Sequence, residues 1–412
     1  MSKAADFQYD VVIVGAGIVG LAVAKTLSEK RPGLRLAVID KERAVAQHQT
    51  GHNSGVIHAG VYYKPGSLKA KLCVQGRKAL LRYCDEKKIA YELTGKLIVA
   101  TDQAEVAKLK ELQERARQNG LQGLRWLDSA EMKGIEPEVQ GEAGLLVPET
   151  GIINYKIVAQ SFQRDLAQNG CVFHFHHRLL GAQRVSAGFL LELSSSDGGR
   201  QSMATKRLIN CAGLYSDQVA RLCGFATPVQ IIPFRGEYYN LSKSAAFTLR
   251  HLIYPVPHPQ FPFLGVHFTK QLDGTIECGP NAVLAMRREG YKKTSFAAAE
   301  FWQMLRFSGL HRIILRHFRY GFYELYRSIF KFGFTKALAR LVPAVRQQDL
   351  LKGGAGVRAQ AVLPDGTLLD DFYIESDAIS FHVLNAPSPA ATACLAIGEE
   401  IVARLENAWG PF

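Results

Sequence analysis

The chain has 412 residues, of which 47% are hydrophobic and 21% are charged, and its formal net charge is +13. This composition predicts a globular protein with room for two lobes. No apolar run reaches the roughly 18 residues of a membrane-spanning helix, and the first ten residues are too polar for a signal peptide. Seven scattered cysteines without a C-x-x-C pair indicate reduced thiols, so we expect a cytoplasmic protein.

The first forty residues contain the pattern of a dinucleotide-binding unit. A β-branched run from Tyr9 to Val14 predicts a strand that is covered on both faces. Gly15, Gly17 and Gly20 then fit G-x-G-x-x-G. In that order, these glycines allow a tight turn, a close approach of the backbone to a pyrophosphate, and a helix packed against the strand. The N-terminus of that helix offers free N–H groups to phosphate.

An acidic residue follows at the spacing expected for ribose recognition. The second strand is predicted from Leu34 to Ile39 and ends in Asp40, twenty residues after Gly20. A carboxylate at this position accepts hydrogen bonds from ribose hydroxyls and repels a 2′-phosphate. We expect Asp40 and the adjacent Lys41 to contact the cofactor.

Two later segments favour FAD over a nicotinamide cofactor. A flavin reductase needs a second nucleotide fold for NAD(P)H, and no second G-x-G-x-x-G follows a strand downstream. The segment LINCAGLYSD predicts a strand that ends in small residues, Ala212 and Gly213, beside the nucleotide. The segment NAPSPAATACLAIGEEIVARL predicts a Pro/Ser turn before a long helix, which would bring Asn385 and Ser388 to the cofactor.

The chain resembles one group of flavoproteins, the FAD-dependent L-2-hydroxyglutarate dehydrogenases or oxidases of the D-amino-acid-oxidase-like superfamily. The similarity is carried by HNSGVIHAGVYYKPGSLKAKLC, PFRGEYYNL, FPFLGVHFT, GAGVRAQ and NAPSPAATACLAIG, and runs from about Tyr9 to Leu405. It implies oxidation of L-2-hydroxyglutarate, a small dicarboxylate 2-hydroxy acid, to 2-oxoglutarate. The expected electron acceptor is a quinone or oxygen.

The resemblance also implies a role for the stretch GHNSGVIHAGVYY. In this superfamily the segment runs beneath the cofactor, from the pyrophosphate to the flavin ring. Thr50, Asn53 and Ser54 would then suit phosphate and ribityl oxygens, and His58 would reach the ring. A glycine-rich loop whose histidines have structural partners is the alternative.

The segments between these motifs predict an antiparallel sheet over the flavin. In VQIIPFRGEYYNL, strand alternation puts Arg235 on one face and Tyr238 on the other, and we expect both to contact substrate. Tyr62 and Tyr254 are further candidates. In PFLGVHFT, the alternation groups Phe263, Gly265 and His267 on one face.

Arg358, in GAGVRAQ, is the strongest candidate for the substrate carboxylate, because the superfamily carries a similar G-x-R there. The planar donor fork of arginine matches a carboxylate, although any one arginine can instead serve a surface salt bridge. Oxidation of a 2-hydroxy acid also needs a base for the hydroxyl proton, and a neutral imidazole suits that task. His58 is the first candidate, with His267 and His52 behind it.

Two other functions compete with this interpretation. An amine-oxidising enzyme of the same fold would need no histidine base. A non-catalytic flavoprotein that binds tRNA would use the basic charge, but no RNA-binding motif is present, so we expect no nucleic-acid partner. We also expect no metal, because strand alternation in FHFHH groups only His174 and His176, and zinc takes at least three protein ligands.

The basic charge is concentrated between residues 301 and 346, where nine Lys or Arg accompany one acid, Glu324. Eleven aromatic residues are interleaved with them up to residue 341. Such a mixture is typical of a helix that lies on a membrane surface, so we expect peripheral association with the inner face of the cell membrane. A helical subdomain that buries these aromatics in its own core or in an oligomer interface is the alternative.

The predicted fold class is α/β, with a Rossmann-like FAD-binding lobe and an interleaved antiparallel-sheet substrate lobe. The FAD-binding lobe would comprise residues 1–85, 145–215 and 345–412. The substrate lobe would comprise residues 86–144 and 216–344, including the basic aromatic helical segment at 301–341.

Overall fold

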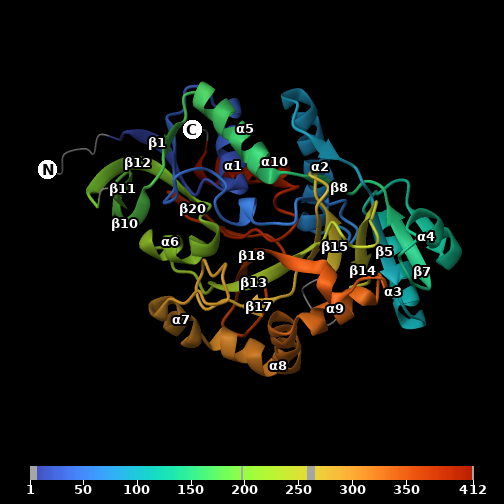
Figure 1. Ribbon diagram of the computed structural model, residues 1–412. Coiled ribbons are helices and arrows are strands. Elements are labelled where there is room, and N and C mark those ends of the chain that lie inside the picture. Colours follow the sequence, from blue (N-terminus) through green and yellow to red (C-terminus); the bar gives the residue numbers. More distant parts are fainter. Residues whose placement is uncertain (1–6, 196–197, 258–264, 411–412) are drawn as a thin grey trace.

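The computed structural model describes residues 7–195, 198–257 and 265–410, and these form three sheets with ten α-helices around them (Figure 1). Phe263 lies outside the described residues. The predicted α/β class is confirmed, with parallel and antiparallel strands in the same molecule.

The first sheet carries the nucleotide-binding unit. Its eight strands are β1 (Tyr9–Val14), β2 (Leu36–Ile39), β9 (Val172–His174), β10 (Arg178–Val185), β11 (Gly188–Ser194), β12 (Arg200–Asn210), β19 (Tyr373–Ser376) and β20 (Ser380–Asn385). Strand β1 lies between β2 and β12 and is parallel to both. Strands β10 and β11 form an antiparallel hairpin on the edge of β12.

Helices cover this sheet because its central strands are apolar on both faces. Val11 and Ile13 pack into a core with α1 (Ile18–Lys30), α5 (Tyr155–Gln168) and α10 (Cys394–Trp409). Val12 and Val14 pack on the opposite side, against the β10–β12 strands and α6 (Ser216–Leu222). Figure 1 shows α1, α5 and α10 grouped on one side of the sheet and α6 on the other.

The second sheet is larger and mostly antiparallel. Its nine strands are β5 (Lys96–Ala100), β6 (Arg125–Asp128), β7 (Ala143–Val147), β13 (Gln230–Leu241), β14 (Leu252–Pro255), β15 (His267–Lys270), β16 (Ile276–Gly279), β17 (Val283–Leu284) and β18 (Leu350–Val362). A small third sheet contains β3 (Val56–Ile57), β4 (Tyr91–Glu92) and β8 (Gly151–Ile153). Strand β18 therefore lies outside the first sheet, although the sequence placed it with the FAD-binding lobe, and β7 spans the predicted lobe boundary between residues 144 and 145.

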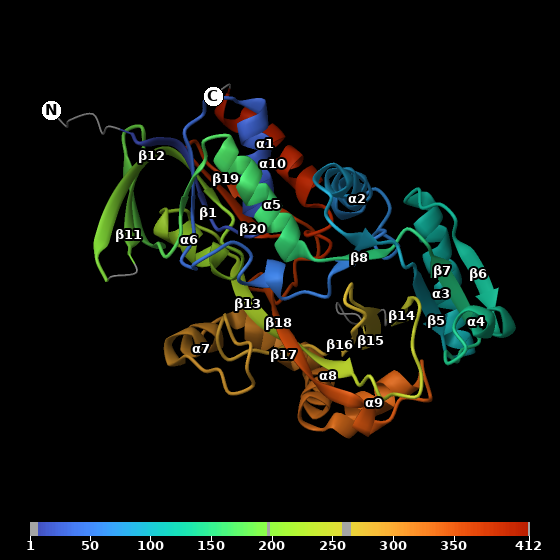
Figure 2. The ribbon, with the colours of Figure 1, turned by 45° about the horizontal axis from the view of Figure 1, so that its top comes forward.

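The remaining helices frame the second sheet. Helices α3 (Gln103–Gln118) and α4 (Ser129–Ile135) pack beside β5–β7, and α2 (Leu68–Lys87) packs against α10. Helices α7 (Ala298–Leu305), α8 (Ser308–Ile329) and α9 (Lys331–Ala339) lie across β13 and β18 from α1, α5 and α10 in both views (Figure 1, Figure 2). The basic aromatic segment is thus an outer helical layer.

Two local predictions were wrong in detail. Strand β9 ends at His174, and His176 has a left-handed φ of +60°, so the two imidazoles do not share a strand face. Helix α10 begins at Cys394, well after the Pro/Ser turn that was expected to start it, because residues 388–393 form successive turns.

Candidate functional site

A cavity of about 1210 Å³ is lined by residues of both large sheets. One end lies at the turn between β1 and α1 and at Asp40, after β2. The other end lies against β13, β14, β15 and β18. The segment from Ala46 to His58 borders the cavity between these ends. An elongated ligand can therefore reach from the first βα turn to the second sheet.

The β1–α1 turn is built for close approach. Gly15 has a φ of +112°, and a Cβ there would lie 2.4 Å from the Cys211 carbonyl oxygen. A Cβ on Gly20 would lie 2.1 Å from the Gly15 carbonyl oxygen, so Gly20 lets the helix pack on the turn and does not line the cavity. Gly17 lines the cavity and is the N-cap of α1, without a side-chain cap. The helix N-terminus is thus presented to the cavity.

Asp40 organises the same end of the cavity. Its Oδ2 accepts a hydrogen bond from the Ala16 N–H at 2.7 Å, and its Oδ1 accepts one from the Glu42 N–H at 2.9 Å. A carboxylate has about four acceptor positions, so ribose hydroxyls can still bind. Thr50 also lines the cavity, and its Oγ1 accepts the Ile18 N–H at 2.9 Å.

Lys41 lines the cavity within a charged cluster. The ligand atoms of Glu42, His48 and Glu289 lie within 4.8 Å of one another, as a metal site would require. The Lys41 ammonium contacts both carboxylates and lies 3.0 Å from His48 Nε2. A cation of the chain itself therefore lies between the two carboxylates, and we assign no metal to the cluster.

The middle of the cavity is formed by the 49–55 loop and by chain segments far away in sequence. Asn53 and Ser54 line the cavity. The Asn53 amide donates to the carbonyls of Gln49 and Thr50, and its Oδ1 accepts the Gly55 N–H, so Asn53 also shapes the loop. Gln49 joins the loop to β18, because its Oε1 accepts the Ala359 N–H at 3.0 Å. Sequence reasoning missed Gln49.

The two later cofactor segments differ in how they reach the cavity. Ala212, Gly213 and Ser388 line it. Asn385 does not line it: its side chain is buried, donates to the carbonyls of Leu369 and Asp371, and accepts from a backbone N–H. Its polar groups are therefore used by the fold.

Two histidines line the cavity close to the second sheet. His267 Nδ1 lies 2.8 Å from the Gly265 carbonyl oxygen, which can only accept, so Nδ1 carries the proton and Nε2 keeps its lone pair. Burial, with help from the charges of Lys96 and Arg358, lowers the pKa of His267 to about 3. Burial likewise holds the pKa of His58 well below its usual value. Both imidazoles are neutral at physiological pH.

The partners of His58 come from two other segments. Its Nε2 lies 3.3 Å from the Ser388 hydroxyl, and its backbone N–H donates to Thr392 Oγ1 at 3.1 Å. His52 also lines the cavity but is exposed, and its ring lies 4.5 Å from that of Tyr291.

Arg358 and three tyrosines complete the end of the cavity at the second sheet. Arg358 lies on β18 opposite Phe234 of β13. Tyr62, Tyr238 and Tyr254 line the cavity with it, and the Tyr254 ring stacks on His267 at 3.8 Å.

Arg235 points away from the cavity. It is buried and ion-paired with Glu237 at 2.9 Å, and it donates to the carbonyls of Gly290 and Lys292. The alternation of β13 explains this, because Gly236 and Tyr238 occupy the cavity face. We therefore leave Arg235 out of the substrate site.

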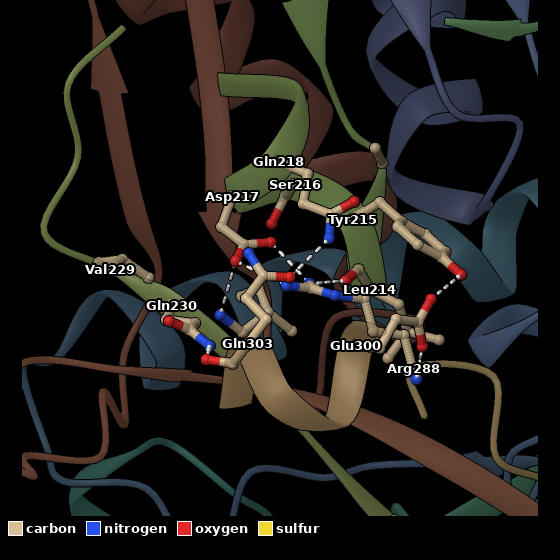
Figure 3. A network of polar contacts seen from close by, with 12 residues as sticks. Leu214, Tyr215, Ser216, Asp217, Gln218, Val229, Gln230, Arg288, Glu300 and Gln303 are labelled. Carbon is tan, nitrogen blue, oxygen red and sulfur yellow. Dashed lines mark hydrogen bonds and ion pairs between the residues drawn. The ribbon is translucent and has the colours of Figure 1, made fainter. Parts of the chain in front are cut away.

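A buried polar network fixes one wall of the cavity (Figure 3). The Arg288 guanidinium donates to both oxygens of Asp217, at 2.6 and 2.9 Å, and to the Leu214 carbonyl. The backbone N–H of Arg288 donates to the Glu300 carboxylate, which also accepts from the Tyr215 hydroxyl. Leu214 and Tyr215 line the cavity, whereas Glu300 lies on α7. The network therefore joins the cofactor end to the outer helices.

Comparison with known proteins identifies the family. The model for FAD dependent oxidoreductases matches residues 10–404. The chain belongs to this family. It is 48% identical to L-2-hydroxyglutarate dehydrogenase of Indibacter alkaliphilus over 394 residues, which cover 95% of this chain and 97% of that relative. The mitochondrial L-2-hydroxyglutarate dehydrogenase of Homo sapiens is 42% identical over 417 residues, covering 98% and 90% of the two chains.

Solved structures show the same fold. L-alpha-glycerophosphate oxidase from Mycoplasma pneumoniae, with FAD bound, has a TM-score of 0.78 at 24% identity and covers 98% of this chain and 97% of its own. Glycine oxidase from Geobacillus kaustophilus has a TM-score of 0.71 at 17% identity, with coverage of 98% and 96%.

This FAD-dependent oxidoreductase has a cavity that fits its cofactor. The Gly15–Gly17 turn can hold the pyrophosphate, and Asp40 can hold the ribose. Between them and the second sheet, the 49–55 loop provides backbone and small polar groups along the cavity. The expectation that the chain is an FAD enzyme is confirmed.

Proposed function

We propose that the chain oxidises L-2-hydroxyglutarate to 2-oxoglutarate. The observation that carries this proposal is the cavity end at which Arg358, His58, His267 and three tyrosines meet. Arginine and tyrosine suit a dicarboxylate, and a neutral imidazole suits the proton of a secondary alcohol. The names of relatives that are 41–48% identical over nearly the whole chain agree with it.

The chain itself would position the substrate and accept its hydroxyl proton. Bound FAD supplies the two-electron acceptor for the hydrogen on the substrate Cα. We assign the proton to His267, because its Nδ1–H is committed to the Gly265 carbonyl and its Nε2 lone pair is available. Arg358 would hold one carboxylate through two parallel hydrogen bonds. The imidazole and the guanidinium would thus fix the orientation of Cα.

Amine oxidation on the same fold remains the competing activity, since glycine oxidase shares this architecture. The neutral imidazoles, which can accept a hydroxyl proton, and the arginine and tyrosine donors, which can bind carboxylates, favour the hydroxy acid. The test is anaerobic addition of L-2-hydroxyglutarate to the yellow holoenzyme, followed by flavin absorbance. We expect bleaching with this substrate, and little with D-2-hydroxyglutarate, glycine, sarcosine or D-amino acids. Bleaching by an amino acid alone would overturn the assignment.

We further propose that the acceptor is a quinone reached at a membrane surface. Among the described residues, no helix is both long and apolar enough to cross a bilayer. Seven of the eleven aromatics of the 301–341 segment are nevertheless exposed, with Phe322 at 70%. The aliphatic Leu315 in the same segment is 77% exposed. Arg316 and Arg319 are exposed on the same helix. This combination favours an interfacial helical layer over one that buries its aromatics.

The same helical layer reaches the cavity. Helix α8 has non-helical dihedrals at His317 (φ −123°, ψ 21°), and His317 lines the cavity. An acceptor dissolved in the lipid could therefore approach the cavity from this face. Oxygen would need no such surface.

Flotation with anionic liposomes tests the membrane proposal. Arg316→Glu/Arg319→Glu should lower partitioning at least roughly thirtyfold at low salt, since loss of two cations that each contribute about 1 kcal/mol near an anionic surface already gives that factor and the two carboxylates add repulsion. Lys110→Glu/Arg117→Glu on α3 is the matched control and should float like the wild type. Equal flotation of both double variants, or no flotation of the wild type, would overturn the proposal.

A further inference from the structure

Lys96 is a buried cation whose surroundings are mainly aromatic. It is the first residue of β5 and is 1% exposed. Among the described residues, no carboxylate forms an ion pair with it. Its Nζ lies instead 4.2 Å from the centroid of the Tyr254 ring and 5.0 Å from that of the Tyr62 ring. Neither aromatic ring supplies a negative counter-charge for the Lys96 ammonium.

Such a placement is costly for the fold. An ammonium group loses its hydration on burial, and a cation–π contact returns only about 2 kcal/mol when it is desolvated. A methionine would fill the same space without that cost. Burial accordingly lowers the pKa of Lys96 to about 7. A group of this kind beside a cavity suggests a role in what the cavity binds.

Both rings over Lys96 belong to the cavity wall. Tyr62 and Tyr254 line the cavity, and the Tyr62 hydroxyl is buried without a hydrogen-bond partner among the described residues. The titratable groups that act on Lys96 from the surrounding elements are Cys73 on α2, Tyr62 and His58 on the 58–63 segment, Tyr254 on β14 and His267 on β15. None of these is an acid that would neutralise an ammonium at neutral pH.

This end of the cavity therefore suits a negatively charged ligand. Arg358 and Lys69 are among the cations that line the cavity. Lys69 is already ion-paired with Asp370 at 2.9 Å, and His58 and His267 are neutral. A dicarboxylate carries two negative charges at neutral pH. The Arg358 guanidinium can offset one of them, and Lys69 is already paired with Asp370, so the Lys96 ammonium is available to offset the second.

We propose that Lys96 is a positioning residue for the anionic substrate: its ammonium, held behind Tyr62 and Tyr254, is the second counter-charge, and it takes up a proton when a dicarboxylate binds. This inference rests on the proposed function for the identity of the substrate. It involves no contact between Lys96 and the reacting carbon. The proton comes from solvent and the ammonium keeps it until the dicarboxylate leaves.

The direction of proton exchange on binding follows from the charge of Lys96 with and without a bound dianion. Without a bound anion, Lys96 is mostly neutral above a pH of about 7. A nearby dianion stabilises the charged form and raises the pKa of Lys96 in the complex. Binding at pH 8 should therefore take up close to one proton. A coupling of one pKa unit corresponds to about a tenfold change in affinity.

Calorimetry of the holoenzyme with glutarate tests this directly. Glutarate has the two carboxylates of the substrate and no hydroxyl to oxidise. Titrations at pH 8 in HEPES and in Tris, which differ in ionisation enthalpy, give the number of protons taken up. We expect close to one for the wild type and near zero for Lys96→Met, with glutarate affinity lowered about tenfold or more. Lys96→Met should keep or raise Tm, because it removes an uncompensated buried charge.

Two further variants make the result specific. Lys96→Arg keeps a charge that cannot be deprotonated, so it should bind glutarate without proton uptake even if Lys96→Met folds poorly. Lys110→Met is the matched control, because Lys110 lies over the Trp126 ring at 6.0 Å and outside the cavity. It should behave like the wild type.

Three outcomes separate this inference from the proposed function. Equal proton uptake by the wild type and Lys96→Met would overturn the role of Lys96, even if L-2-hydroxyglutarate bleaches the flavin. Lys96-dependent uptake with glutarate, without bleaching by L-2-hydroxyglutarate, would support Lys96 and overturn the substrate assignment. A wild type that does not bind glutarate would overturn both.

Discussion

The buried pair between Arg288 and Asp217 gives the sharpest stability prediction. The two side chains are 1% and 0% exposed, and two hydrogen bonds of 2.6 and 2.9 Å join them. Arg288→Met would leave the Asp217 carboxylate buried, with the Ile231 N–H at 3.2 Å and Arg221 at 3.3 Å as its remaining donors. Removing one partner of a buried pair typically costs about 3–5 kcal/mol.

The cost should appear both in stability and in cofactor retention. With an unfolding entropy of about 2.1 cal/mol/K per residue, 3–5 kcal/mol corresponds to a loss of roughly 3–6 °C in Tm for a chain of this length. Differential scanning calorimetry of the holoenzyme measures that shift. FAD should also dissociate more readily, because Leu214 and Tyr215 of the cavity wall are held by the same network (Figure 3).

A double variant identifies the cause. Asp217→Asn/Arg288→Met removes the stranded charge and should recover part of the lost Tm. If Arg288→Met changes Tm by less than about 1 °C, the network does not hold this wall. If the double variant loses the sum of the two single losses, the unpaired carboxylate is not the source of the cost.

The remaining predictions concern FAD retention, the histidine that accepts the hydroxyl proton, the arginine that binds the substrate carboxylate, and the pH dependence of stability. Asp40→Ala should weaken FAD retention, measured by flavin fluorescence after gel filtration, since it removes a ribose acceptor and the partner of two backbone N–H groups. His267→Ala should keep FAD and slow flavin reduction about 10²–10⁴-fold in stopped-flow experiments; a loss below tenfold, with a larger one in His58→Ala, would move the base to His58. Arg358→Ala should raise the Kd for substrate strongly, and Arg358→Lys should restore it only in part because lysine lacks the planar fork. Since the pKa of Lys96 falls from 10.5 to about 7 on folding, the unfolded chain binds more protons between these values. Stability should therefore rise with pH across that window, and Lys96→Met should flatten the slope of Tm against pH.

The sequence alone predicted those parts of the site that depend on neighbouring residues. Strand β1 has the predicted bounds, because a β-branched run and the glycines after it restrict the same short stretch of backbone. The conformations of Gly15 and Gly20 follow from the contacts within one βα unit. The position of Asp40 follows from the length of the helix and turn before it. The residue pattern favoured FAD, and family resemblance strengthened that inference and added the oxidoreductase class; the family model confirms both.

Tertiary structure decided which side chains share the cavity. Periodicity puts Arg235 and Tyr238 on opposite faces of β13, but only the packing of the outer helices shows that the Tyr238 face is turned to the cavity. Lys96 reads in sequence as an ordinary cation before an apolar run, and only the burial of β5 between β7 and β14 places its ammonium behind two tyrosines. Contacts between residues far apart in the chain decide which strands pair, which face of a strand meets the cavity and which side chains are buried. The local sequence pattern does not determine those contacts.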